Sequence, residues 1–560
     1  MSYLPGMADI ERIKHEKDAL DVWDDIARYA KSGFASIAPD EIARMRWYGI
    51  YQQKPNVGQF MWRIKLPGGR VTPPQLREIG LLTNQYGRGS ADITTRQDIQ
   101  LHWMTIENMP DALDRIYNKV GLYTDFACGD TPRNVCSCPL DGLIPSQIAP
   151  LGGLVQNISD MFRSGGKEFS NLPRKFKVSA AACPLHCHQP QINDIGVFGV
   201  LRDRDGQQQQ GVGILVGGGL SSTPHFAQGL RVFIAQDKIQ EQVPRIVREL
   251  AHLFNDSDEC RYKRKHARFK FVVAAKGWQW VRDELERRLG FALEHDESIV
   301  NPPNTPHTDH MGLGALNNGL HYVGVPVPRG RWTGDQMIAI ADLTQRFAAP
   351  GQGQIRLSQK QNFLLVNIPQ ENIDPLSREL EKIALPPQAP IWRDSLLSCT
   401  GMQYCNLAVV ETKDRAKQIL DHLEKEVQLD SPIMVSVTGC PNACAQVQIA
   451  DIGLTGTKAI WNDQKVDAFD LMVGGCLGAE PKFATTIVQK IPADLVRNVV
   501  TQLTRNYLAH RSAPADAEPE TFRDFVQRHD AAQLAAWSSI PDWTPKPRRT
   551  NEPPAAPDNA

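Results

Sequence analysis

Apolar residues recur along the chain with two periodicities, which predict short strands and amphipathic helices. Strand-like runs of β-branched and aromatic residues occur in FMWRIKLP (60–67) and ADITTRQDIQLHWMTI (91–106), and MPDALDRIYNKVG (109–121) then has the apolar spacing of a helix. An N-terminal helical arm is expected roughly from Asp9 to Arg46. Because strands and helices alternate in this order, the pattern favours an α+β sandwich for each small unit.

The same pattern occurs twice in the chain. Residues 178–199 (VSAAACPLHCHQPQINDIGVFG) and 435–456 (VSVTGCPNACAQVQIADIGLTG) are identical at twelve of twenty-two positions without a gap. Upstream, LPGGRVTPPQL (66–76) is similar to VPRGRWTGDQM (327–337), and TTRQDI (94–99) is similar to LSQKQN (357–362). The sequence therefore predicts two related halves, each a strand-and-helix unit followed by a glycine-punctuated α/β unit.

The bulk composition limits the class of protein. A length of 560 residues predicts several domains, and 41% hydrophobic with 22% charged residues is typical of a globular protein. A formal net charge of -1 gives no whole-chain field that favours nucleic acid or a membrane as partner. No apolar run approaches the roughly 20 residues that span a bilayer, so a soluble, cytoplasmic protein is expected. One helix is predicted in TFRDFVQRHDAAQLAAW (521–537), and the end of the chain (544–560) is expected to be disordered.

Eleven cysteines need an explanation, because disulfides do not persist in a reducing cytosol and clustered thiols there more often bind metal. They fall into four groups and two single residues: Cys128, Cys136 and Cys138; Cys183 and Cys187; Cys399 and Cys405; Cys440 and Cys444; Cys260; Cys476.

The last two groups form a C-x5-C pair, Cys399 and Cys405, and a C-x3-C pair, Cys440 and Cys444. Four thiolates are the usual ligands of a 4Fe–4S cluster, whereas structural zinc sites prefer other spacings. A glycine and a proline flank Cys440 and indicate a tight turn, which would let backbone N–H groups point at sulfur. The sequence therefore predicts an iron–sulfur cluster on these four residues.

CTGMQYC followed by VTGCPNAC resembles the cluster signature of the siroheme-dependent sulfite and nitrite reductases. TTRQDIQLHW, TPRNVCSCP and LPRKFK resemble that family's other signatures, in the same order, and the similarity runs from about Ile10 to about Arg511. It implies an α+β fold with a pseudo-twofold internal repeat, in which two ferredoxin-like half-domains accompany two siroheme and 4Fe–4S α/β domains. The domains expected are an N-terminal arm (1–50), half-domain 1 (51–120), α/β domain 1 (121–305), half-domain 2 (306–388), α/β domain 2 (389–512) and a C-terminal tail (513–560).

The resemblance also implies roles for individual residues. Cys444, the last of the four cluster ligands, would be the thiolate shared with the siroheme iron. Four cations would hold the anionic substrate: Arg96, Arg133, Lys175 and Lys177. Further contacts to the siroheme carboxylates are expected from Gln97, Gln100, His102, Asn134, Arg174, and Arg268 or Lys270. For the basic stretch RYKRKHARFK (261–270), a solvated helix face is the competing interpretation.

In this family the expected reaction is the six-electron reduction of sulfite to sulfide or of nitrite to ammonia. Lys177 favours sulfite, because the nitrite reductases typically have Asn there and a dianion gains more from an extra cation. Nitrite stays the alternative, since TTRQDIQLHW is at least as similar to that branch. No G-x-G-x-x-G fingerprint follows a predicted strand, so a separate donor such as reduced ferredoxin is expected, with the enzyme a monomer.

Two other functions remain open from the sequence: a precorrin-3B synthase-like enzyme, and an iron–sulfur electron carrier without catalysis. The cysteines of the first half are a departure from the pattern, because many relatives lack Cys183 and Cys187. They would be a relic of the duplication, or would bind a second cluster with two of Cys128, Cys136 and Cys138, or would supply one reactive thiol.

Overall fold

The computed structural model describes residues 3–53, 55–303, 309–514, 518–541 and 543–544. It divides into two compact units. The first unit comprises residues 1–395 with the short segments 403–406 and 477–481, and the second comprises the remainder from residue 396 onward. Within the described residues, none of the helices has the length and apolar character needed to cross a membrane.

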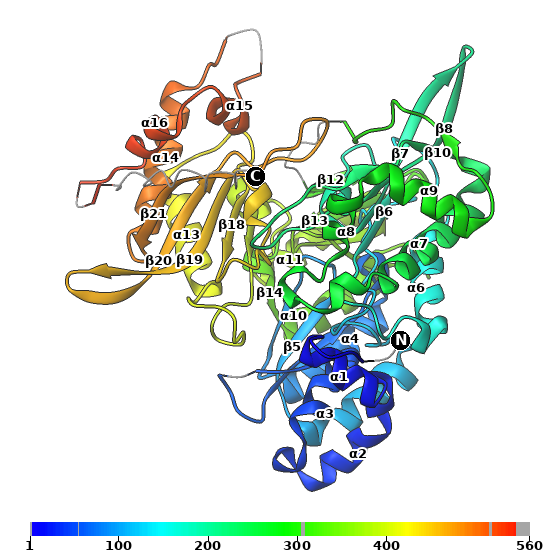
Figure 1. The fold of residues 1–560 in the computed structure, drawn as a ribbon. Coiled ribbons are helices and arrows are strands. Elements are labelled where there is room, and N and C mark those ends of the chain that lie inside the picture. Colours follow the sequence, from blue (N-terminus) through cyan, green and yellow to red (C-terminus); the bar gives the residue numbers. More distant parts are fainter. Residues whose placement is uncertain (1–2, 54, 304–308, 515–517, 542, 545–560) are drawn as a thin grey trace, which may run out of the picture. The chain divides into compact units, whose positions relative to one another are not determined.

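The first unit opens with a helical arm, coloured dark blue in Figure 1. Acidic residues lie in the first turn of each arm helix, where they complement the positive end of the helix dipole. The arm helices are α1 (Asp9–Glu16), α2 (Trp23–Ser32) and α3 (Pro39–Arg44).

Two half-units of the same topology follow in the first unit. The first contains β1 (Ile50–Gln52), β2 (Phe60–Ile64), β3 (Arg70–Val71), α4 (Pro73–Tyr86), β4 (Ser90–Ile93), β5 (Ile99–Met104) and α5 (Met109–Asp114). The second contains β12 (Gly312–Ala315), β13 (His321–Val325), β14 (Arg331–Thr333), α10 (Gly334–Phe347), β15 (Gln354–Leu357), β16 (Phe363–Ile368) and α11 (Ile373–Lys382).

The two half-units exchange strands, which makes them one body. Their sheets have the orders β1-β2-β5-β4-β14 and β12-β13-β16-β15-β3, so each sheet takes its edge strand from the other half. The exchange is repeated in the side chains: Gln97 Nε2 donates to the carbonyl of Leu357 at 2.6 Å, and Gln361 Nε2 donates to the carbonyl of Ile93 at 2.8 Å. Gln97 and Gln361 both have positive φ, of 61° and 66°, so the repeat extends to the turn that presents them.

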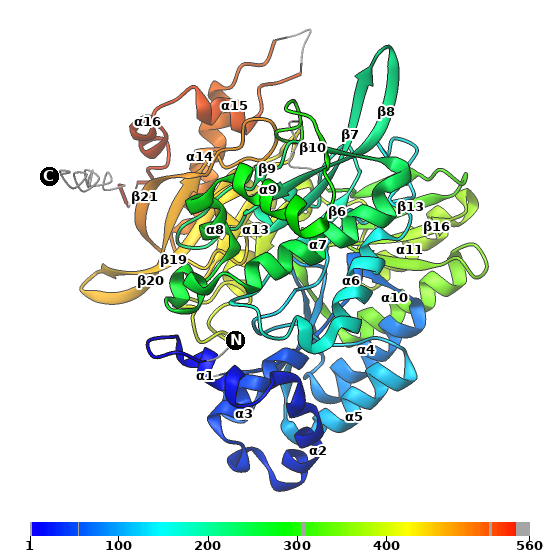
Figure 2. The ribbon, with the colours of Figure 1, turned by 45° about the vertical axis from the view of Figure 1, so that its right-hand side comes forward.

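The first α/β part completes this unit. Its sheet has the order β11-β10-β8-β7-β6, and α7 packs along it with a fully apolar buried side (Figure 2). Its elements are α6 (Leu154–Gly165), β6 (Val178–Ala181), β7 (Ile195–Arg204), β8 (Gln207–Val216), β9 (Gln228–Gly229), β10 (Val232–Ala235), α7 (Ile239–Asn255), α8 (Phe269–Lys276), α9 (Trp278–Leu289) and β11 (Glu294–His295). The short α12 (Ile391–Asp394) ends the unit.

The second unit is built on a sheet of order β17-β18-β19-β20-β21. In its sheet, β17, β18 and β19 are parallel neighbours, and β19–β21 are antiparallel, with β19–β20 a long hairpin (Figure 1). Its elements are β17 (Leu396–Ser398), α13 (Lys413–Glu426), β18 (Val435–Thr438), β19 (Ile452–Trp461), β20 (Gln464–Val473), β21 (Thr485–Pro492), α14 (Val496–His510), α15 (Phe522–Gln527) and α16 (Ala531–Ala536).

The predicted α+β fold with an internal repeat is confirmed. Strands β6, β7 and β8 of the first unit correspond to β18, β19 and β20 of the second with the residue offset of the repeated sequence. The predicted single helix over 521–537 is wrong, because the chain forms two short helices there. Asp530 interrupts it by accepting a hydrogen bond from the N–H of Gln533, which caps a new helix. The predicted disorder of 544–560 lies almost wholly outside the described residues.

Candidate functional site

The basic motif after the Pro173 turn places two lysines side by side. Lys175 and Lys177 flank Phe176, which makes an isolated parallel bridge with Pro132 directly before β6. Phe176 is fully buried whereas both lysines are partly exposed. Since side chains alternate along extended chain, the two ammonium groups share one face.

Lys177 lies in a neighbourhood of like charge. Burial lowers its pKa well below the usual range, and the nearby cations Arg96, Lys175 and Arg268 lower it further, while Asp194 opposes them. Four positive charges therefore meet in one partly desolvated place. An anion bound among them would reverse the shift and favour the protonated lysine.

The Arg96 guanidinium is held in a fixed orientation. Its Nη1 donates to Asn193 Oδ1 at 2.8 Å, and its Nη2 donates to the carbonyls of Asn134 at 2.5 Å and Val178 at 3.1 Å. Its Nε is buried and has no hydrogen-bond partner within the described part of the chain. An unused buried N–H is costly unless a ligand meets it, so Arg96 is suited to receive an oxygen atom.

Two further predicted cations are also desolvated. Arg133 donates to the carbonyls of Ala127 at 3.0 Å and Gly129 at 2.8 Å, and Arg174 donates to the carbonyl of Arg264 at 2.9 Å. Burial lowers the pKa of each guanidinium to about 10. This surplus of buried positive charge fits a group that carries several carboxylates, such as siroheme, together with a small oxyanion.

Two predicted siroheme contacts have structural partners in the protein. The Gln97 amide donates to Ser137 and accepts from the N–H of the same residue, in addition to its bond to Leu357. The Asn134 amide donates to the carbonyl of Leu66 at 2.6 Å. Both side chains thus use their N–H groups on the backbone, and their contact with siroheme stays a prediction.

The predicted contacts Gln100 and His102 lie on β5, and His102 contacts Tyr404 of the first unit. Gln100 is opposite Asp92 of β4, and His102 Nε2 lies 3.1 Å from Asp92 Oδ2. The His102 ring stacks on Tyr404 with centroids 3.8 Å apart and planes at 10°. His102 therefore fixes Tyr404, the residue before the predicted cluster ligand Cys405, and all of them belong to the first unit.

The basic stretch 261–270 is divided, because Lys263, Lys265 and His266 are exposed whereas Arg268 and Lys270 are buried. Its interpretation as a solvated helix face is therefore wrong for Arg268 and Lys270. Arg268 is 7% exposed and forms an ion pair with Asp194 at 2.9 Å. Lys270 is 1% exposed and donates to several carbonyls, that of Thr223 at 2.5 Å among them. Sequence alone could not show this, because the partners come from distant segments.

Three of the four predicted cluster ligands lie in the second unit. Cys399 follows β17, and its Sγ accepts a hydrogen bond from the N–H of Gly439 at 3.2 Å, directly beside Cys440. Burial raises the pKa of Cys399, and the nearby Cys444 raises it further. Thiols that gather around a turn with an amide N–H on sulfur fit the ligands of an iron–sulfur cluster. The fourth, Cys405, belongs to the first unit.

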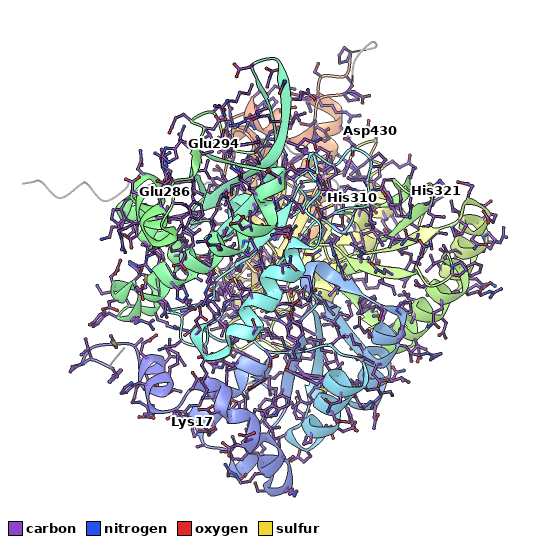
Figure 3. All side chains as sticks on the ribbon, turned by 90° about the vertical axis from the view of Figure 1, so that its right-hand side faces the viewer. Lys17, Glu286, Glu294, His310, His321 and Asp430 are labelled. Atoms are coloured by element: carbon purple, nitrogen blue, oxygen red, sulfur yellow. The ribbon has the colours of Figure 1, made fainter. Side chains whose placement is uncertain are left out.

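A second set of ligands lies within the first unit. The Sγ atoms of Cys138, Cys183 and Cys187 and a ring nitrogen of His310 all lie within 4.8 Å of one another. His310 is labelled in Figure 3, and its signal in the sequence is weak, because it stands alone 123 residues after Cys187. No spacing rule could have paired it with these cysteines.

The other two cysteines of the first group lie elsewhere. Cys136 Sγ is 3.6 Å from the carbonyl of Arg96, and burial raises its thiol pKa to about 11. Cys128 is close enough to Arg133 to affect the pKa of that guanidinium. A histidine, and not another cysteine, therefore completes the set around Cys183 and Cys187.

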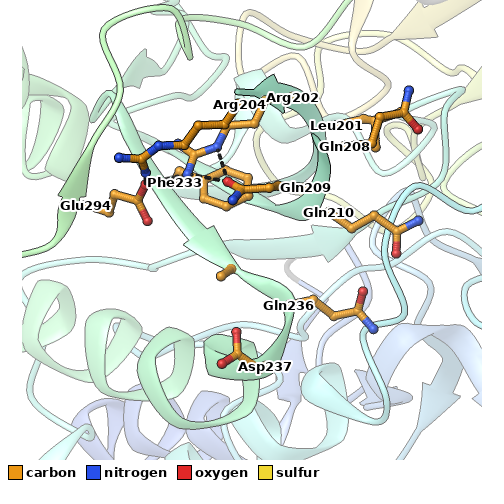
Figure 4. Close-up of a pocket in the computed structure, with 11 residues that line it drawn as sticks. Leu201, Arg202, Arg204, Gln208, Gln209, Gln210, Phe233, Gln236, Asp237 and Glu294 are labelled. Atoms are coloured by element: carbon orange, nitrogen blue, oxygen red, sulfur yellow. Dashed lines mark hydrogen bonds and ion pairs between the residues drawn. The ribbon is translucent and has the colours of Figure 1, made fainter. Parts of the chain in front are cut away.

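An open pocket of about 680 Å³ lies on the outer part of β7, β8 and β10 (Figure 4). Arg202 covers the Phe233 ring at 3.6 Å and donates to Gln209. None of the predicted site residues lines this pocket, and both of its arginines, Arg202 and Arg204, are already paired with Glu294. It has no evident part in the chemistry predicted from the sequence.

Two protein-family models match the chain. The nitrite and sulphite reductase 4Fe-4S domain matches residues 128–293 and 394–541. The nitrite/sulfite reductase ferredoxin-like half domain matches residues 51–119 and 315–383. Each model matches twice, as the internal repeat requires.

Individual relatives cover almost the whole chain. An assimilatory ferredoxin-dependent nitrite reductase of Haloferax mediterranei is 34% identical, covering 92% of this chain and 91% of its own. A ferredoxin sulfite reductase of Mycobacterium tuberculosis is 32% identical, covering 94% and 95%. The solved structure of the Mycobacterium tuberculosis NirA protein superposes with a TM-score of 0.86 at 32% identity, covering 94% of this chain and 97% of that one. The chain belongs to the nitrite and sulfite reductase family, and it is an oxidoreductase that uses siroheme and a 4Fe–4S cluster.

Proposed function

We propose that this protein reduces sulfite to sulfide with six electrons that a ferredoxin delivers one at a time. The observation that carries the proposal is the charge around Lys177, where Arg96, Lys175 and Arg268 act on a partly desolvated ammonium group. These surroundings disfavour the charged form of Lys177 when no anion is bound, and they favour the binding of an anion.

The cofactors would be held by the cysteines of the second motif pair. Cys399, Cys405, Cys440 and Cys444 would ligate the cluster, and Cys444 would also ligate the siroheme iron. The N–H of Gly439 on Cys399 supports this arrangement. When bound, these groups supply electrons to the anion, and the protein's own residues supply binding and protons.

The arginines and the lysines of the cation cluster are suited to different roles, binding of the anion and delivery of protons. Arg96 and Arg133 would orient the oxyanion through their Nε–H groups, which are buried and have no hydrogen-bond partner within the described residues, while their Nη groups are held by the protein. Lys175 and Lys177 would donate protons as oxygen leaves as water, and the lowered pKa of Lys177 suits that residue to this role.

The siroheme carboxylates would be held by the rest of the basic cluster. Arg174 and Arg268 are proposed for these contacts, with Gln97, Gln100, His102 and Asn134 as polar neighbours. The lowered pKa of Arg174 supports its part, because desolvated positive charge there is relieved by a carboxylate.

Sulfite is preferred over nitrite on the charge of the anion. The attraction between an ion and a cation scales with the product of their charges, so each lysine in the pocket favours the dianion more than the monoanion. The similarity to the nitrite reductase of Haloferax mediterranei makes nitrite reduction the second candidate.

A parallel assay separates the two substrates. Cofactor-loaded protein is given sulfite and nitrite separately, with a chemically reduced dye as donor, and kcat/KM is determined for each. A higher value for sulfite is expected. A clear preference for nitrite would overturn the sulfite proposal while leaving the reductase proposal intact.

The electron donor is proposed from the relatives, several of which are named for ferredoxin. Charge complementarity would bring a small acidic carrier and the enzyme together, so turnover with ferredoxin should fall as salt rises. We place the reaction in the cytoplasm and expect a monomer, which light scattering of the holoenzyme tests.

A further inference from the structure

Three cysteine thiols of the first unit lie close around one histidine ring. His310 Nε2 lies 3.2 Å from Cys138 Sγ, 3.7 Å from Cys183 Sγ and 3.7 Å from Cys187 Sγ. The site is largely enclosed, since Cys138, Cys183 and His310 are 1%, 0% and 7% exposed, while Cys187 is partly exposed. Four ligand atoms thus converge on one point.

The two distances of 3.7 Å match the edges of a tetrahedron around a single ion, and the distance of 3.2 Å is slightly shorter. Zinc–sulfur bonds of about 2.3 Å and zinc–nitrogen bonds of about 2.0–2.1 Å place tetrahedral ligand atoms roughly 3.5–3.8 Å apart. Three cysteines with one histidine are also a common ligand set of structural zinc. A four-iron cluster fits less well, because each of its thiolates binds a different iron and the ligand atoms are then spread further apart.

We propose that Cys138, Cys183, Cys187 and His310 bind one zinc ion with a structural role, separate from siroheme and the 4Fe–4S cluster. Binding replaces the three thiol protons, which are released to solvent, and the dication offsets two of the three negative charges of thiolates that would otherwise repel one another. All four coordination positions come from the protein, so the ion has no open position for a substrate.

The position of the site indicates what the ion fixes. Cys183 and Cys187 belong to the loop after β6, whereas His310 directly precedes β12 of the second half-unit. Apolar residues of both parts surround the thiols: Leu140, Ala181, Leu316, Leu364 and Val366. The ion would therefore fasten the α/β part of the first unit to the exchanged half-units.

A neighbouring carboxylate positions the histidine segment. Asp309 accepts hydrogen bonds from Ser358 and from Asn362 Nδ2, the latter at 3.3 Å, and its other oxygen accepts from the N–H of His310. The Tyr322 ring meets the His310 ring edge-on at 6.3 Å. These contacts hold the imidazole toward the thiols before any ion binds.

Metal analysis of the holoenzyme is the primary test. Purified wild-type protein is analysed for zinc, iron and siroheme together, and the zinc absorption edge is used to identify the ligands. We expect about one zinc per chain with three sulfur neighbours and one nitrogen neighbour. Protein that is loaded with iron and siroheme but holds no zinc would overturn the proposal. So would extra iron at these cysteines in place of zinc.

Variants then assign the site. His310→Ala and Cys187→Ser are expected to lose zinc to a chromophoric chelator at least about tenfold more readily than wild type, with the iron and siroheme content kept. Cys260→Ser is the matched control, because Cys260 is a buried thiol of the same unit outside both ligand sets. Equal zinc retention in all three variants would overturn the assignment. Neither readout depends on which anion is reduced, so failure of the proposed function would be recognised separately.

Discussion

The two cysteine loops, 183–187 and 440–444, share a left-handed residue at the same position but differ in their surroundings. His186 and Ala443, at equivalent positions, have positive φ values of 46° and 52°. Equivalent aspartates, Asp194 and Asp451, stand directly before the strand that follows each loop. A non-glycine residue in this region costs about 1–2 kcal/mol, so its presence in both loops indicates a geometry fixed by the surrounding fold.

What differs is the source of the other ligands. The first loop meets Cys138 and His310 in a largely enclosed apolar site, whereas the second loop lies beside Cys399, and its Cys444 is exposed. The same duplicated loop can thus contribute to a zinc site in one half and to a 4Fe–4S site in the other. The additional ligands decide which, because they set the distances between the ligand atoms.

The largest effect should come from removing one thiol from each loop. Cys444→Ser is expected to abolish reductase activity and the siroheme absorbance, because it removes the proposed shared ligand. The equivalent change in the first loop, Cys187→Ser, should retain both. Measurement of activity, iron content and visible spectrum on the two variants compares the loops directly. Loss of siroheme from Cys187→Ser would contradict the assignment of zinc to the first loop and of the cluster and siroheme to the second.

The next effect concerns the cation cluster around Lys177, which lies in the first unit. Lys177→Gln should lower kcat/KM for sulfite by about 10²–10³-fold, since it removes a cation close to the developing charge. Nitrite should be affected less, because its single charge gains less from that lysine. Lys276→Gln, on the exposed end of α8, is the control. An equal loss for both substrates would mean that Lys177 does not discriminate between them.

The same lysine predicts a pH effect. Since the folded protein lowers the pKa of Lys177 from 10.5, the anion-free state binds fewer protons than the unfolded chain. This contribution to the free energy of unfolding therefore rises with pH below 10.5. Anion binding should take up a proton and weaken as pH rises. Calorimetry of sulfite binding in buffers of different ionisation enthalpy measures the uptake, which Lys177→Met should remove. Proton release on binding would contradict the assignment.

The sequence predicts the repeat and the shared face of two lysines, because both are encoded locally, whereas the other two cations of the cluster are implied by the family resemblance. The repeated cysteine motif retains twelve identities, and strands recur at one residue offset. The KFK motif places Lys175 and Lys177 on one face by alternation alone. Both features can be predicted from neighbouring residues alone, without the tertiary contacts of the chain.

Contacts between distant segments are what the sequence could not reveal. His310 reaches the thiols only because β12 and its neighbours pack against the first α/β part. Lys270 and Arg268 are buried because carbonyls and Asp194 from other segments satisfy them. Gln97 matches a family motif, yet its left-handed turn directs the amide to the backbone. In each case tertiary packing decides which polar groups remain available for a ligand.

The aspartates after the two loops sharpen the comparison. Asp194 accepts from the N–H of Lys177 at 2.9 Å and pairs with Arg268, whereas Asp451 accepts from the N–H of Met434 at 2.8 Å. Asp194→Asn should cost about 3–5 kcal/mol of unfolding free energy, because it leaves a buried guanidinium without its counter-ion. Asp451→Asn should cost about 1–3 kcal/mol. Urea unfolding of the two holoenzyme variants measures the difference, and equal losses would contradict it.

The smallest effect is expected at two equivalent glycines, which tests how far the backbone match extends. Gly217 and Gly474 have φ values of 82° and 79°, so alanine would be strained by about 1–2 kcal/mol at either position. An added Cβ would also lie 2.6 Å from Val273 at Gly217 and 2.8 Å from Val526 at Gly474. Val273 is fixed in the core by α8, whereas Val526 lies on the six-residue helix α15, which can shift. Gly217→Ala should therefore lower the unfolding free energy more than Gly474→Ala. The reverse order would mean that α15 is held as firmly as the core of the first unit.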